Sequence, residues 1–122
     1  MTEHDDGAGA RIRAVVGSWD GVTVAPHRFG GFEFRLGRRE LGHVHGDRIA
    51  DLPFPRRIPD ELVAGGRARP HHVLPDTGWV TAPLGEPEDV DGAIELFRLS
   101  YERADRARRS RQSAVGQGDF DG

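Results

Sequence analysis

The sequence predicts an α+β domain in which helices at both ends of the chain pack on one face of a curved antiparallel sheet. Near the two ends, apolar residues recur at spacings of three and four, as in amphipathic helices. Between these segments, apolar residues alternate with polar ones, as in strands with one buried face. Because glycine-containing turns separate the strands, we expect a meander of about five strands, with a short helix before the last strand.

A first helix is expected from Ala10 to Ser18. Its inward face combines aliphatic side chains with one tryptophan: Ile12, Val15, Val16 and Trp19. A second, brief helix should begin near Pro59, because proline suits the first helical turn. It should stop at Gly65 and Gly66, because glycine readily adopts the left-handed conformation that ends helices.

The last helix has the clearest pattern. Pro87 suits the first helical position, and acidic side chains lie where the helix dipole is positive: Glu86, Glu88 and Asp89. Spacings of three and four then build one apolar stripe, which consists of Val90, Ala93, Ile94, Phe97, Tyr101 and Ala104. We expect this stripe to be buried.

Strands are expected where the apolar period is two. Four of them precede the brief helix, and the fifth begins at Trp79. Phe32 to Leu36 alternates most regularly, and the run from Arg39 to Leu52 breaks at Gly46 and Asp47, a pair that hairpin turns accept. Gly42 and Gly46 alternate with the histidines of this run, so an aromatic ring could approach the opposite face closely.

Length and composition predict one domain, at residues 10–106 of the 122-residue chain. The absence of cysteine excludes disulfides, thiolate metal sites and a cysteine nucleophile. No apolar run approaches the roughly 20 residues that span a bilayer, so a cytoplasmic protein without membrane contact is expected. All 17 basic residues are arginine, which is typical of the coding bias of a GC-rich, bacterial genome.

The two ends are expected to be disordered, at residues 1–9 and 107–122, because they lack apolar periodicity. An arginine run from Arg103 to Arg111 extends into the second of these tails. It is interpreted as a solvated helix end rather than a contact for phosphate or RNA. The net charge of −3 also disfavours a dedicated nucleic-acid binder.

The candidate functional residues are four histidines with neighbouring carboxylates. His43 and His45 are two apart in an expected strand, so both imidazoles should lie on one face. Adjacent residues of an extended chain point apart, so only one of His71 and His72 can join them. Asp76 or Glu40 would supply an oxygen donor.

Three interpretations of these histidines remain open. The preferred one is that they form hydrogen bonds with the backbone and carboxylates on a half-buried polar face. The second is a metal site, for which His43, His45 and His72 are the candidates; the pattern falls short of a full ligand set, so no metal uptake is expected. The third is acid–base catalysis.

The aromatic residues Phe34, Phe54 and Trp79 line either a ligand cavity or the core, and their strand period favours the core. Pro53 and Pro55 surround Phe54 and prevent ladder hydrogen bonds at both positions. This rigid segment is either the rim of a pocket or a stiff connection to the next helix.

Several consecutive motifs resemble the small proteins of the "luciferase domain" family. They are FEFRLGRRELGHVHGD (residues 32–47), DLPFP (51–55), DELVA (60–64), HHVLPDTGWV (71–80) and LFRLSYER (96–103). The resemblance covers roughly Val22 to Ala104. Its name implies no mechanism for this chain, because a flavin-dependent luciferase is a barrel of about 250 residues or more. The end of the chain is also similar, more distantly, to MmcQ/YjbR-type proteins, which have a helix-flanked antiparallel sheet and a suspected DNA-binding role.

The expected function is therefore binding of a small ligand or a protein partner on the sheet face that carries His43, His45 and Trp79. An alternative is a metal-dependent or acid–base enzyme that uses His43, His45 and one of His71 and His72. A second alternative is a nucleic-acid module that uses Arg38, Arg39 and the arginine tail. No nucleophile elbow, P-loop or dinucleotide fingerprint is present in the sequence, so catalytic residues and cofactors are unassigned.

Overall fold

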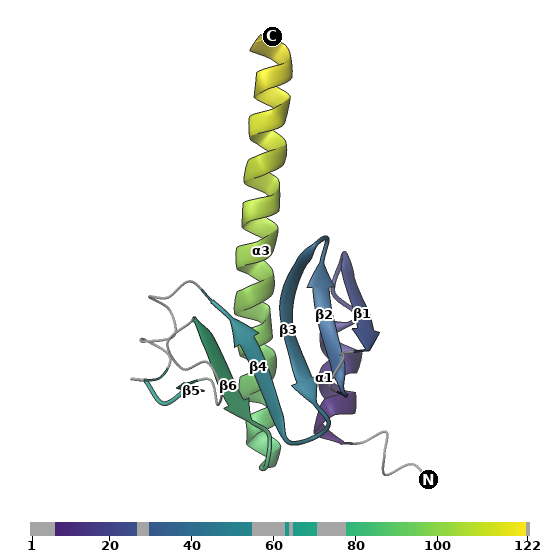
Figure 1. Cartoon of the computed structure of the whole chain (residues 1–122), viewed down its shortest axis with the longest axis vertical. Coiled ribbons are helices and arrows are strands. Elements are labelled where there is room, and N and C mark those ends of the chain that lie inside the picture. The colour runs from purple at the N-terminus through teal and green to yellow at the C-terminus, as the bar shows by residue number, and fades with distance from the viewer. Residues whose placement is uncertain (1–6, 27–29, 55–62, 64, 71–77, 122) are drawn as a thin grey trace.

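The α+β architecture is confirmed by a computed structural model, which describes residues 7–26, 30–54, 63, 65–70 and 78–121 (Figure 1). Its elements are α1 (Ala8–Val16), β1 (Val22–Pro26), β2 (Phe32–Leu36), β3 (Arg39–His45), β4 (Ile49–Pro53), β5 (Arg69–Pro70), β6 (Trp79–Pro83) and α3 (Pro87–Asp121). The strands form one antiparallel sheet in the order β1-β2-β3-β4-β6-β5. Both helices lie behind the sheet in Figure 1.

The five expected strands are all present, and the sixth, β5, has two residues and pairs with β6 at the sheet edge. A two-residue strand has too short a pattern to be recognised by alternation. The brief helix expected from Pro59 falls mainly on residues 55–62 and 64, which lie outside the described residues. None of the helices in the described part of the chain combines the length and the apolar composition needed to cross a membrane.

Helix α1 corrects two expectations. It begins at Ala8 rather than Ala10, so Ala8 and Gly9 are helical and not part of a disordered tail. The reason is a cap supplied from the β3–β4 loop, where the carboxylate Oδ1 of Asp47 accepts a hydrogen bond of 2.8 Å from the Gly9 N–H. The helix also ends at Val16 rather than Ser18. Residues 1–6, the rest of the expected tail, lie outside the described residues.

The inward face of α1 is narrower than expected. Ile12 and Val16 are fully buried, and Trp19 packs against the core after the helix ends. Val15, however, is 38% exposed. One helical position rotates the side chain by about 100°, so a stripe that buries Gly9, Ile12 and Val16 turns Val15 toward solvent.

Helix α3 begins at Pro87, as expected, and the Asp89 carboxylate accepts a 2.9 Å hydrogen bond from the Glu86 N–H. Its expected stripe is buried, with Ile94 only partly so. Two further buried residues, Leu96 and Ser100, widen this face. The Ser100 hydroxyl donates to the Leu41 carbonyl over 2.8 Å and thereby ties the helix to β3.

The end of α3 overlaps the tail expected at residues 107–122. The helix continues to Asp121, beyond the expected boundary at residue 107. The segment contains no proline and several good helix formers, so the backbone hydrogen-bond ladder can extend after the apolar stripe has ended. Figure 1 shows this part of α3 projecting beyond the sheet.

The core lies between the helices and the sheet. Phe34 of β2 and Phe97 of α3 pack edge to face, with ring centroids 5.2 Å apart. Gly42 has a φ of +150°, and a Cβ there would lie 2.7 Å from the Phe97 ring, so glycine permits the close approach expected at this position. The helix-facing residues of the central strands are all buried: Leu41, Val44, Ala50, Leu52, Val80 and Ala82.

Candidate functional site

A β-bulge in β3 brings Glu40 to the same side of the sheet as His43. Arg35 of β2 pairs with Glu40, while the preceding residue Phe34 pairs with Gly42, so Leu41 is an extra residue in the ladder. Strict alternation would place Glu40 on the face opposite His43. The extra residue Leu41 shifts the alternation by one position, so Glu40 lies on the same face as His43. Nδ1 of His43 lies 2.7 Å from a Glu40 carboxylate oxygen.

The turn between β3 and β4 determines which residue faces His43. The ladder pairs His45 with Ile49 and His43 with Asp51, so the turn contains three residues, Gly46 to Arg48. A two-residue turn at Gly46 and Asp47 would shift the register by one position and move Asp51 to the helix-facing side. The longer turn therefore puts the Asp51 carboxylate beside the histidines.

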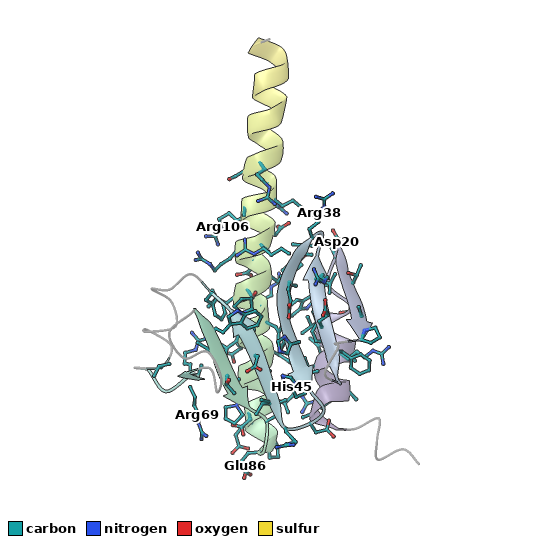
Figure 2. The ribbon with its side chains drawn as sticks, in the orientation of Figure 1. Asp20, Arg38, His45, Arg69, Glu86 and Arg106 are labelled. Atoms are coloured by element: carbon teal, nitrogen blue, oxygen red, sulfur yellow. The ribbon has the colours of Figure 1, made fainter. Side chains whose placement is uncertain are left out.

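These side chains form an outer-face network, which we define as Glu40, His43, His45, Asp51 and Thr81. Asp51 Oδ2 lies 3.1 Å from Nε2 of His45 and 3.5 Å from Nε2 of His43. The Thr81 hydroxyl donates a 2.6 Å hydrogen bond to Asp51 Oδ1. Asp51 is fully buried, so these contacts replace the hydration that its carboxylate loses on folding. In Figure 2, His45 lies on the lower part of the sheet.

The network sets the charge of His43. Burial is the largest single influence and lowers the pKa of His43. The hydrogen bonds with Asp51 and Glu40, together with their negative charges, outweigh it and raise the pKa from 6.5 to about 9. His43 is therefore an imidazolium at neutral pH, shared between two carboxylates.

Three residues of the network offer donor atoms that are close enough together to hold a metal ion. One donor atom each from His43, His45 and Asp51 lie within 4.8 Å of one another. Ligand atoms about 2.1 Å from one tetrahedral ion lie roughly 3.4 Å apart, close to the separations from Asp51 Oδ2. Glu40 and Thr81 hold His43 and Asp51 from behind, as outer-sphere partners of metal ligands do.

A groove opens beside the network because β3 and β4 separate. Their ladder ends at the pair His43–Asp51, since Pro53 has no N–H to donate, whereas β4 stays paired with β6 as far as Trp79. Figure 1 shows β3 curving away from β4 at this end. The groove has a volume of about 480 Å³ and is lined by Arg39, Glu40, Pro53, Phe54 and Trp79. We call it the strand-separation groove.

Four of the seven candidate residues come together here. His43 and His45 share a face, as expected, with ring centroids 4.8 Å apart, and the His43 ring lies 5.4 Å from the Trp79 ring. Glu40 is the oxygen donor beside them. His71, His72 and Asp76 lie outside the described residues.

Sequence reasoning did not identify Asp51 and Thr81 as site residues. The available signal was a charged residue between Ala50 and Leu52, whose alternation puts Asp51 on the face opposite two core side chains. Its histidine partners could not be inferred without the ladder register. Phe54 and Pro53 do form the wall of a groove, which was one of the two expectations for that segment.

The fold and site define a small α+β domain whose sheet is covered by helices on one face and carries a buried histidine–carboxylate network on the other. The family model of the luciferase domain matches residues 38–100, just over half of the chain, and the chain belongs to this family. The match includes β3, β4, β6 and every described residue of the network and the groove. No curated protein and no solved structure matches the chain, and the distant similarity to MmcQ/YjbR-type proteins has no support from these comparisons.

Proposed function

We propose that this protein binds a small organic ligand in the strand-separation groove. The observation that carries the proposal is that the groove shares Glu40 with the outer-face network, while its Trp79 contacts His43. Aromatic and proline side chains supply an apolar wall, and a few charged groups lie at fixed positions beside it. This combination is typical of small-molecule sites.

The rigidity of the groove supports the same proposal. Pro53 has a fixed φ, and Trp79 is paired with it across the β4–β6 ladder, so this wall belongs to the sheet. The opposite wall is held by the Glu40–His43 hydrogen bond. A ligand therefore meets side chains that are already ordered, which reduces the entropy cost of binding.

A neutral fluorescent dye tests whether the groove accepts an aromatic ligand. N-phenyl-1-naphthylamine should bind saturably to the wild-type protein with increased emission. Trp79→Ala should weaken this binding about tenfold or more, because it removes the largest aromatic wall. The matched control is Trp19→Phe, which changes the other tryptophan, packed against Tyr101 on the helix side. Equal binding by the wild type and Trp79→Ala would show that the proposed site is wrong.

The second candidate function is binding of a divalent transition metal by His43, His45 and Asp51. The three-donor cluster supports this candidate. The competing interpretation, preferred from the sequence, is that the same residues form only a hydrogen-bonded scaffold. A bound metal would stabilise the folded state by mass action. Thermal unfolding of chelator-treated protein with added zinc or nickel tests this: a saturable rise of several degrees should appear for a metal site.

Two variants separate a specific metal site from surface binding. His45→Ala should abolish the rise, whereas Asp91→Asn, which changes an exposed carboxylate of α3 paired with Arg11, should retain it. Unfolding curves that coincide with and without metal would leave the outer-face network as a hydrogen-bonded support for the groove.

A further inference from the structure

The end of the sheet where β3 begins carries a second, basic groove. Its volume is about 260 Å³, and it is lined by Arg39 of β3 and by Arg103, Arg106, Ala107 and Ser110 of α3. In Figure 2, Arg106 and Arg38, the residue before Arg39, lie at this end of the sheet, on either side of α3. Arg39 also lines the strand-separation groove, so the two grooves share this residue.

The three guanidinium groups of this groove have no carboxylate partner in the part of the chain that the structure describes. Within the described ranges, no hydrogen bond or ion pair to a side chain is found for Arg39, Arg103 or Arg106. The nearest acidic residues of α3 are engaged elsewhere: Glu102 pairs with Arg98, and Asp105 pairs with Arg108 and Arg109. Positive charge is therefore concentrated at the groove.

One donor of the groove is also shielded from water. Nε of Arg103 is buried and has no hydrogen-bond partner among the described residues. A buried donor without an acceptor is costly, so the hydrogen-bonding capacity of Arg103 is not fully used within the described residues. Planar guanidinium groups match the paired oxygens of carboxylates and phosphates, and the Ser110 hydroxyl offers an additional donor.

We propose that Arg39, Arg103 and Arg106 bind the anionic head group, a carboxylate or a phosphate, of a ligand whose apolar body lies against Trp79 in the strand-separation groove. This inference rests on the proposed function and specifies its ligand class as an amphipathic organic anion. A small anion is favoured over nucleic acid because Arg108 and Arg109 are both paired with Asp105, which leaves the arginines of the groove as a local site rather than part of a continuous basic track.

Two dyes with the same ring system test the assignment. 8-Anilino-1-naphthalenesulfonate has the skeleton of N-phenyl-1-naphthylamine plus one sulfonate. Arg103→Gln and Arg106→Gln should each weaken binding of the sulfonate dye about tenfold and leave binding of the neutral dye unchanged. The reason is that only the sulfonate dye carries an anionic group that the arginines can contact. Trp79→Ala should weaken both dyes. The control is Arg109→Gln, which removes one positive charge from the same helix at an exposed residue that does not line the groove.

The outcomes distinguish the two proposals. If Trp79→Ala weakens both dyes while the arginine variants affect neither, the ligand groove stands and the head-group site is wrong. If the arginine variants weaken both dyes equally, their effect is structural and the head-group site is also wrong. If Trp79→Ala changes neither dye, the ligand groove itself fails. Circular dichroism of each variant confirms that α3 is retained.

Displacement then identifies the head group. Phenyl phosphate and benzoate should displace the sulfonate dye at lower concentration than phenol, which has the ring without the anion, and the better displacer of the two defines the head group. Equal displacement by phenol would overturn the proposal. So would salt-sensitive displacement by single-stranded RNA at concentrations where both small anions are inactive, because that result assigns the groove to a nucleic-acid backbone.

Discussion

The two faces of the central strands each contain a fully buried side chain, but the chemistry of these side chains is opposite. Leu52 on the helix-facing side and Asp51 on the outer side are neighbours in β4, and both are 0% exposed. Leu52 joins a continuous apolar core, whereas Asp51 contacts two imidazoles and the Thr81 hydroxyl. Burial stabilises the first side chain directly. It stabilises the second only if its hydrogen bonds and counter-charges remain in place.

This difference indicates where mutations should be tolerated. The helix-facing side depends on volume and can exchange one apolar side chain for another of similar size. The outer side depends on a set of matched partners, so removing a single member leaves the others buried without compensation. Substitutions on the two faces should therefore differ in pH dependence and not only in magnitude.

The largest effect is expected for Phe97→Ala on the helix-facing side. This change removes a fully buried ring that packs against Phe34 and Gly42, and it should lower the free energy of unfolding by about 3 to 5 kcal/mol. Urea denaturation measures it. Leu99→Ala, at a partly buried position of the same helix, should cost about 1 kcal/mol or less. Equal costs for the two variants would show that the stripe is not the centre of the core.

On the outer face, Asp51→Ala should lower the free energy of unfolding by about 3 kcal/mol at pH 7, because it leaves the His43 charge with one carboxylate fewer. The matched control, Asp91→Ala, removes an exposed carboxylate and should cost no more than about 0.5 kcal/mol. A small effect at Asp51 would mean that the network adds little to stability and serves the site alone.

The pH dependence of the free energy of unfolding should also distinguish the outer face from the helix-facing side. Because the pKa of His43 is raised to about 9 in the folded state, its protonation favours folding. This contribution is fully present below about pH 6.5 and is lost as pH rises through 9; it amounts to a few kcal/mol. Unfolding at pH 6, 7.5 and 9.5, with chelator present, should show the decline in the wild type and in Phe97→Ala.

His43→Gln should remove most of this decline, because glutamine does not titrate. The difference between His43→Gln and the wild type isolates His43 from the other groups that ionise over the same range. A decline that is the same in both proteins would contradict the raised pKa of His43.

The smallest effect is expected outside both faces. Deletion of residues 111–122 removes the part of α3 that projects beyond the sheet and should change the free energy of unfolding by less than about 0.5 kcal/mol. The measurement is the urea midpoint, with circular dichroism to record the lost helix. A large loss of stability would show that this segment contributes to the folded domain.

The sequence was sufficient for the first and last helices, for five of the six described strands, and for most of their core-facing residues. The periods of 3.6 and two identified both long helices, five strands and nearly the whole stripe of α3, because these periods follow from local backbone geometry. It failed at Val15 and at the start of α1. The width of the buried face of α1 and the hydrogen bond from Gly9 to Asp47 depend on what the helix contacts. They do not depend on the apolar pattern of the helix itself.

The sequence by itself determined that His43 and His45 share one side of a strand, because side chains in a strand repeat every two residues. Only the tertiary structure decided which groups join them. One extra residue in β3 brings Glu40 to that side, and one extra residue in the following turn brings Asp51. A single-residue change in register reverses the face of every later side chain, and loop length and bulges are set by packing across the whole sheet. The position of the groove also depends on strand pairing. β4 stays paired with β6 but separates from β3, because Pro53 cannot donate a hydrogen bond to β3.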